Sequence, residues 1–333
     1  MKTEGFNYGI ALLRIWMCFE VVMCHFDLGV TSVKSYDILR ISKEFAVPCF
    51  MFISFYYFAK FDFNDLDNIK SRMLRLIVPH ISWSIIYFLV YIWTSNDSII
   101  NVLLKLVLQI SFGHTLNRAM WFQVDLIAIT ALYIWGKRKW NINLKKLSII
   151  GLVIAYAMQY TGINYEIFLK LPYSMSYTLG RIAEMFPFAA AGYLLGNKNL
   201  LMDIKIKIKR ERLYLYGILG MIVGGCVLRS CLLRGKGFGY NGGLDILITV
   251  CLINIFFYCV SDVMPQILLP FVKRLSSYTM GIYFSHNLIG RILLKFFPQG
   301  NGIIFSLIVF GGALIFCWGI SKIPNKQIKN LLI

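Results

Sequence analysis

The sequence predicts an all-α polytopic membrane protein with about ten transmembrane helices and both termini on the cytoplasmic side. Hydrophobic residues make up 58% of the 333 residues, whereas charged residues make up only 15%. Apolar stretches of about 20 residues, the length that crosses a ~30 Å hydrocarbon core, recur along the whole chain. We therefore expect a single integral-membrane domain over residues 1–333, with no soluble second domain.

Ten apolar segments are expected to span the bilayer. The first is not expected to be a signal peptide, because Arg14 and Glu20 interrupt it and no small-residue cleavage site follows. Two shorter segments, 98–112 and 263–272, are expected to lie at the interface or to re-enter the bilayer, because Lys105 interrupts one and two prolines break the other. The predicted spans are 8–30, 41–59, 76–94, 119–136, 147–163, 177–196, 213–233, 243–261, 277–295 and 302–321.

The distribution of basic residues predicts the orientation of these spans. Short cytoplasmic loops of membrane proteins hold an excess of lysine and arginine. With the N-terminus inside, the predicted inner loops receive most of the 34 lysines and arginines of the chain. We interpret the net charge of +18 as a consequence of the membrane topology, which places basic loops against the anionic inner leaflet of the bilayer. We expect no nucleic-acid partner.

The first predicted span contains two residues, Arg14 and His25, that are costly to place in a bilayer. At about 100° and 1.5 Å per residue, they lie within roughly 20° of one helix face and about 16 Å apart. Intramembrane ionisable residues of this kind indicate a functional site. The alternative interpretation is that Arg14 snorkels to the interface and that His25 only anchors the other end.

Three further ionisable residues inside the spans are candidates for the same site. Glu20 lies about 120° away from the face of Arg14 and His25, so we expect it to pair with a cation on a neighbouring helix. His286, in the ninth span, is either a packing histidine or an alternative acid–base group. Arg181 is spaced to pair with Glu184 on the sixth span, which favours a structural role.

Arg72 and Arg75 precede the third predicted span and share a helix face. They are either ordinary anchors at the inner leaflet or a phosphate site, since the guanidinium fork suits phosphate oxygens. No metal is expected, because the eight cysteines form no CxxC pair and no Cys/His cluster at ligand spacing. No Walker-type or dinucleotide-binding glycine pattern is present.

An ordered set of motifs follows the predicted spans. It begins with an arginine, ten residues and a histidine in ALLRIWMCFEVVMCHF, and continues with VPCFMFISFYY, SRMLRLIVPHISW, AMWFQVDL, RIAEMFPFAAAGYLLG and YTMGIYFSHNLI. Over nearly the whole chain this set resembles the integral-membrane acyltransferase family 3, the O-acyltransferases of surface glycans. The chain departs from the family at Ser54-Phe55, where Ser-Gly is common, so the shape of a pocket or helix contact there is expected to differ.

The resemblance implies an O-acyltransferase in the cytoplasmic membrane of a bacterium. It would transfer an acyl group, expected to be acetyl, from cytosolic acyl-CoA to a hydroxyl of an extracytoplasmic or lipid-linked glycan. His25 would act as general base or as a transient acyl carrier, and Arg14 would orient the donor. Arg72 and Arg75 would contact the CoA phosphates, and a homo-oligomer is compatible with this reading.

A transporter or flippase for a glycan or a lipid-linked oligosaccharide is the alternative from another class. Intramembrane Arg, Glu and His residues would then line a polar pathway. A transporter would need no thioester and often has an inverted repeat, which the sequence does not display. A purely structural subunit leaves the ionisable residues of the first span unexplained.

Overall fold

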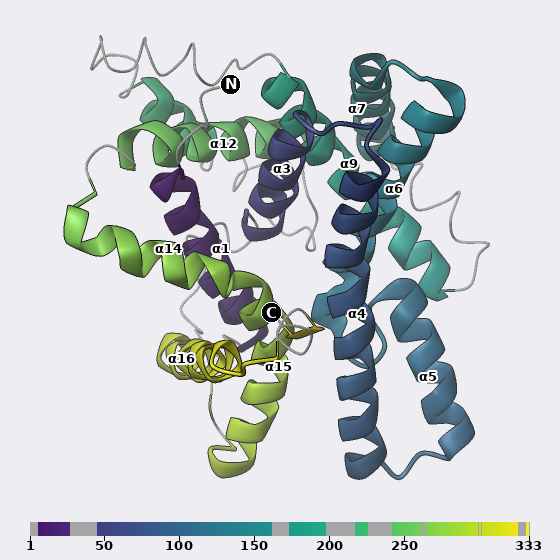
Figure 1. Ribbon diagram of the computed structural model, residues 1–333, viewed down its shortest axis with the longest axis vertical. Coiled ribbons are helices and arrows are strands. Elements are labelled where there is room, and N and C mark those ends of the chain that lie inside the picture. The colour runs from purple at the N-terminus through teal and green to yellow at the C-terminus, as the bar shows by residue number, and fades with distance from the viewer. Residues whose placement is uncertain are drawn as a thin grey trace.

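The computed structural model describes residues 6–26, 45–161, 173–197, 217–225, 242–260, 264–298, 300, 302–325 and 331–332. All the regular secondary structure in these ranges is helical, which confirms the predicted all-α class (Figure 1). The elements are α1 (Tyr8–Phe26), α3 (Ala46–Phe58), α4 (Leu66–Thr94), α5 (Ile99–Phe112), η1 (Arg118–Met120), α6 (Trp121–Trp140), α7 (Leu144–Thr161), α9 (Tyr173–Asn197), α12 (Gly242–Asn254), η2 (Ile255–Val260), η3 (Gln266–Leu268), α14 (Leu269–Ser277), α15 (Thr279–Phe296) and α16 (Gly302–Ser321).

Four helical stretches within the described residues are long and apolar enough to cross a membrane: α1, α4, Arg118–Trp140 and α16. The full count of about ten spans and the N-in, C-in orientation stay predictions. The two basic loops at 198–212 and around Lys236, on which part of the charge argument depends, lie outside the described residues.

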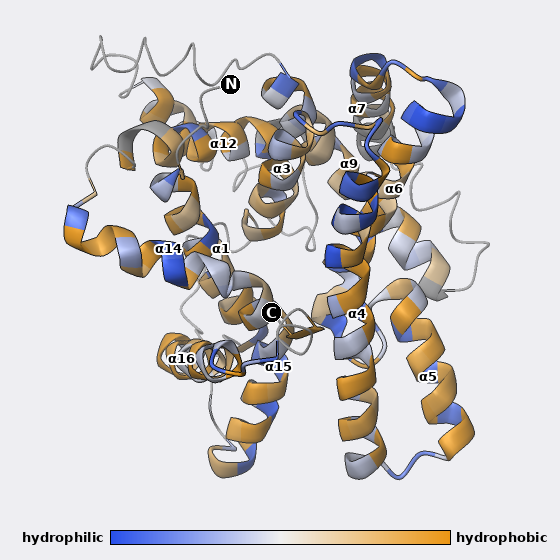
Figure 2. Cartoon of the chain, in the orientation of Figure 1, coloured by the Kyte–Doolittle hydropathy of each residue, from blue (hydrophilic) through white to orange (hydrophobic). Residues whose placement is uncertain are grey.

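Helix α4 begins at Leu66, ten residues before the predicted start of the third span at 76, so the helix extends beyond the predicted span. Asp65 caps the helix, because its carboxylate accepts hydrogen bonds from the backbone N–H groups of Asp67 and Asn68. The first turns are polar and the rest of α4 is largely apolar, as the colouring of Figure 2 shows. Hydropathy marks only the apolar part of a helix, so it misses capped polar turns. Arg72 and Arg75 therefore lie inside the helix and are not in a loop.

Helix α5 covers the short segment 98–112, whose placement at the interface or as a re-entrant segment stays a prediction. It has 14 residues against the 29 of α4, and it lies beside the C-terminal half of α4 (Figure 1). Lys105, in its middle, donates hydrogen bonds to the hydroxyl of Tyr91 and to the carboxylate of Asp97. The hydrogen bond from Lys105 holds the pKa of the Asp97 carboxyl below its ordinary value. The charge of Lys105 is thus paired with Asp97, in the turn that joins α4 to α5.

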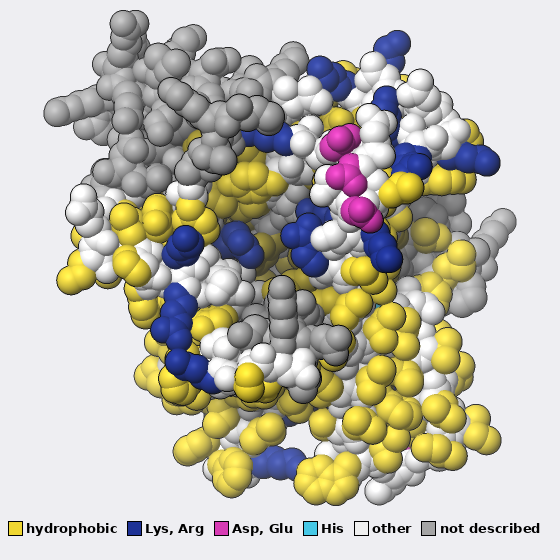
Figure 3. Space-filling view, viewed as in Figure 1, with side chains coloured by type: hydrophobic (Ala, Val, Ile, Leu, Met, Phe, Trp, Pro, Cys, Tyr) yellow, Lys and Arg dark blue, Asp and Glu magenta, His cyan; other side chains and the backbone are white. Residues whose placement is uncertain are grey.

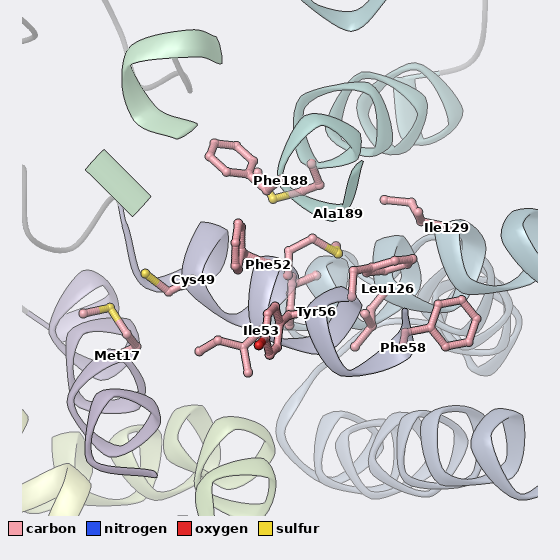
Figure 4. Packing of buried hydrophobic residues seen from close by; sticks show 14 of the residues in the cluster. Met17, Cys49, Phe52, Ile53, Tyr56, Phe58, Leu126, Ile129, Phe188 and Ala189 are labelled. Carbon is pink, nitrogen blue, oxygen red and sulfur yellow. The ribbon is translucent and has the colours of Figure 1, made fainter. Parts of the chain in front are cut away.

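The core is built around α3, which packs most extensively against α9. Figure 4 shows Phe52 on the side of α3 toward Phe188 and Ala189 of α9, and Ile53 and Tyr56 on the other side. Small residues let the two backbones approach closely, as is usual between helices in membranes. A Cβ atom on Gly192 of α9 would lie 2.3 Å from the Phe52 carbonyl oxygen, and one on Gly196 would lie 2.2 Å from that of Tyr56.

A second apolar cluster joins α1 to α15 and α16. It includes Val22 and Phe26 of α1, Ile282 of α15, and Val309 of α16. Arg14 of α1 contacts Thr279 of α15, and His25, later on α1, contacts His286, later on α15. The two helices therefore run in the same direction, as expected of the first and ninth spans of an alternating bundle.

Candidate functional site

A cavity of about 830 Å³ lies between α1, α3, α4, α6, η2 and α15. Figure 3 shows a recess over α1, α3 and α4, with Lys and Arg side chains on both sides. Most of the lining is apolar, with aromatic rings from several helices. Apart from the hydroxyls of Tyr57 and Tyr283, the polar side chains that line the cavity are those of Asn7, Arg14, Ser54, Arg72, Gln123 and Thr279. Two arginines from different helices thus face one largely apolar space.

Arg14 is held in the cavity wall by α15. Its Nη2 donates a hydrogen bond to Thr279 Oγ1 over 2.9 Å, and Thr279 Oγ1 donates in turn to the Ser276 carbonyl over 3.0 Å. Among the described residues, Arg14 forms no ion pair with a carboxylate. A guanidinium has five N–H donors, so most of its donor capacity stays available to a carbonyl or an anion in the cavity.

Arg72 also faces the cavity, whereas Arg75 does not. Arg72 Nη2 donates to Ser54 Oγ over 2.8 Å, and its guanidinium lies 5.0 Å from the ring centroid of Phe58. Arg75 is exposed on α4, and its Nε donates to the Ser71 carbonyl over 3.2 Å. The structure therefore separates two arginines for which the sequence predicted the same role.

His25 lies beside His286, the other histidine that the sequence singled out. Their ring centroids are 5.2 Å apart and their planes are tilted by 40°. His25 is half-buried and His286 is fully buried. Neither lines the cavity, but Tyr283 does, and its ring centroid is 6.3 Å from that of His286. The candidate site thus has an arginine end and a histidine end, joined along α1 and α15.

The two remaining candidates lie outside this cavity. Glu20 is 4% exposed and accepts a hydrogen bond from Trp16 Nε1 of its own helix over 2.7 Å. Arg181 forms the predicted ion pair with Glu184, at 3.0 Å, and its guanidinium lies 4.8 Å from the ring centroid of Trp121. The contacts of Arg181 favour the structural role expected from its spacing.

The sequence predicts no role for Thr279, Gln123 or Tyr283, and at Ser54 it predicts only a changed shape of a pocket or helix contact. Thr279 and Tyr283 fall inside the motif YTMGIYFSHNLI, and Gln123 falls inside AMWFQVDL, so the motifs marked the segments but not the contacts. Gln123 Nε2 donates to the Leu76 carbonyl over 2.9 Å, and its Oε1 has no hydrogen-bond partner within the described part of the chain. In the same part of the chain, no group of three or more His, Cys, Asp or Glu side chains could hold a metal.

The apolar helices indicate an integral-membrane protein, and a cavity with polar groups lies between them. Residues 7–322 match the model of acyltransferase family 3, which is described as an acyltransferase domain. The chain belongs to this family, as the order of its motifs predicted. Comparison with curated proteins and with solved structures gives no match. Family membership supports acyl transfer over the transporter alternative.

Proposed function

We propose that the protein is an O-acyltransferase that uses cytosolic acyl-CoA, with acetyl-CoA as the expected donor. The acceptor is a hydroxyl of an extracytoplasmic or lipid-linked glycan, and the protein works in the cytoplasmic membrane of a bacterium. Family membership supports the reaction class. The donor assignment depends mainly on one observation, the cavity that Arg14 and Arg72 both line.

The chemistry of this cavity suits a long donor with a charged head and a less polar arm. Arg72 binds phosphate oxygens of the nucleotide, because its planar fork can bond two of them at once. Aromatic and aliphatic side chains such as Phe50, Ile53 and Phe257 contact the pantetheine arm. Arg14 orients the arm or the thioester carbonyl through donors not used by Thr279. Arg75, on the adjacent exposed face of α4, contributes to phosphate binding from outside the cavity.

His25 carries the acid–base step. Its imidazole takes the proton of the acceptor hydroxyl while that oxygen attacks the thioester carbon. The carbon–sulfur bond breaks, and the CoA thiolate receives the proton from the imidazolium. In the other version, a His25 nitrogen attacks the thioester carbon, the carbon–sulfur bond breaks and CoA leaves as the thiol with the proton from the other His25 nitrogen. The acceptor hydroxyl then attacks the acyl carbon, the bond from that carbon to His25 breaks, and the imidazole takes the hydroxyl proton. Glu20 and His286 are the remaining candidates for the base.

Acyl transfer by the purified protein tests this proposal. The protein in lipid nanodiscs is incubated with acetyl-CoA and a panel of bacterial glycans, and free CoA and acetylated glycan are both measured. We expect equal amounts of the two products, and a decrease of both by about 10²-fold or more with His25→Ala. Glycan movement across vesicles without any donor would support a transporter and overturn the proposal.

A further inference from the structure

His286 has a defined hydrogen on one ring nitrogen. Its Nδ1 lies 3.1 Å from the carbonyl oxygen of Ile282, one turn earlier on α15. A carbonyl oxygen can only accept, so Nδ1 carries the hydrogen in this contact. A neutral imidazole has one N–H, and its other nitrogen is then an acceptor. Nε2 of His286 is therefore the acceptor.

This acceptor is buried and needs a donor. His286 is 0% exposed, and its Nε2 has no hydrogen-bond partner among the residues described. Within the described part of the chain, three aromatic rings lie next to His286, those of His25, Phe26 and Tyr283. Phe26 has no polar hydrogen, and the Tyr283 hydroxyl already donates to the Ala119 carbonyl. His25 is the ring of the three whose N–H can turn to Nε2.

We propose that His286 is the positioning residue for His25: its Nε2 accepts the N–H of one His25 nitrogen and leaves the other nitrogen free as the base. This inference rests on the proposed function of His25. A hydrogen bond at one ring nitrogen determines which tautomer the imidazole adopts, and therefore whether the other nitrogen carries a hydrogen. When His25 takes the hydroxyl proton, the bond to His286 is retained and stabilises the imidazolium. The proton then passes to the CoA thiolate, and His286 keeps its own hydrogen throughout.

Two substitutions of His286 separate positioning from packing. His286→Gln can place a carbonyl oxygen near the position of Nε2, whereas His286→Phe keeps a ring and removes the acceptor. We expect His286→Phe to lower kcat by about 10²-fold, near the lower end of general-base effects, with the KM of acyl-CoA unchanged. His286→Gln should recover most of the rate. In the His25→Ala protein, His286→Phe should cause no further loss.

A matched control removes a different buried histidine. His80, on α4, is 3% exposed, and its Nε2 lies 3.0 Å from the Ile110 carbonyl oxygen. His80→Phe should leave kcat within about 2-fold of wild type, because it does not contact His25. Equal losses of kcat in His286→Phe and His286→Gln would overturn the proposal. So would a His286→Phe substitution that lowers kcat as much in the His25→Ala protein as in the wild type.

The tautomers can be measured without any substrate. The chain has 4 histidines, so long-range ¹H–¹⁵N correlation spectra of protein labelled with ¹⁵N-histidine are simple to assign. We expect the hydrogen of His286 on Nδ1, and a single tautomer of His25 that becomes a mixture in His286→Phe. A hydrogen on Nε2 of His286, or an unchanged His25 in that variant, would contradict the pairing. If the protein shows the expected tautomers but transfers no acyl group, the pairing of the two histidines stands and only the proposed function is refuted.

Discussion

Arg14 and Thr279 are 265 positions apart in the sequence, and a hydrogen bond of 2.9 Å joins Arg14 Nη2 to Thr279 Oγ1 across α1 and α15. The hydroxyl of Thr279 already uses its hydrogen on the Ser276 carbonyl, so its lone pair is directed to the arginine. This arrangement fixes one edge of the guanidinium and turns the remaining donors to the cavity. We therefore expect Thr279 to position Arg14.

Thr279→Val tests that role, because valine keeps the shape and loses the acceptor. A hydrogen bond to a charged group contributes about 1.5–3 kcal/mol, and part of this is lost when Arg14 is free to turn. We expect the KM of acyl-CoA to rise by about 10-fold. Thr279→Ser, which keeps the hydroxyl, is the control and should stay close to wild type. A Thr279→Ser protein as impaired as Thr279→Val would show that only packing matters here.

Arg72→Ala and Arg75→Ala test the phosphate contacts. Contacts remote from the reacting carbon contribute mainly to binding, so both should raise the KM of acyl-CoA at similar kcat. Because only Arg72 lines the cavity, its substitution should have the larger effect. Initial rates at varied donor concentration measure both constants. If the acceptor's KM changes while the donor's does not, these arginines belong to another site.

His25→Ala and Arg14→Lys test the two ends of the site. His25→Ala should insert and unfold like the wild type, since a small apolar residue is no harder to bury than imidazole, but it should lose about 10²-fold or more of its activity. Arg14→Lys should be partly active, because lysine keeps the charge and loses the planar fork. Thermal unfolding in detergent checks that each protein is folded. A stable His25→Ala protein with near wild-type activity would move the search for a base to His286 or Glu20.

Gly192→Ala tests the packing of α3 on α9. The added Cβ would lie 2.3 Å from the backbone oxygen of Phe52, so one helix must move. Overpacking of this kind costs typically about 1–3 kcal/mol, which should lower the midpoint of thermal unfolding. Gly319→Ala on α16 is the control, because its Cβ has no atom within 4 Å among the described residues. Equal midpoints for the two variants would contradict the close packing of α3 and α9.

Single-cysteine labelling tests the predicted orientation. In a protein with the eight native cysteines replaced, cysteines placed in 137–146 and 198–212 should react only after the membrane is opened. Cysteines at Lys170 and Lys236 should react in intact cells. Labelling of 198–212 from outside intact cells would rule out the ten-span arrangement.

The sequence by itself determined the properties that depend on local periodicity and on motif order. Composition predicted an all-α membrane protein, and the ordered motifs predicted the family that residues 7–322 match. Spacing along one helix predicted that Arg181 pairs with Glu184, at 3.0 Å in the structure. Such predictions succeed because residues three or four apart on a helix are always neighbours.

The tertiary structure decided which distant groups meet. Spacing placed Arg14 and His25 on one face, but only the packing of α15 against α1 brings Thr279 to the first and His286 to the second. Likewise Arg72 and Arg75 are close along α4, yet only Arg72 turns to α3 and the cavity. Hydropathy marks segments that prefer lipid, and it carries no information about which faces of separate helices touch. Those contacts depend on the close approach of side chains from helices far apart in the chain.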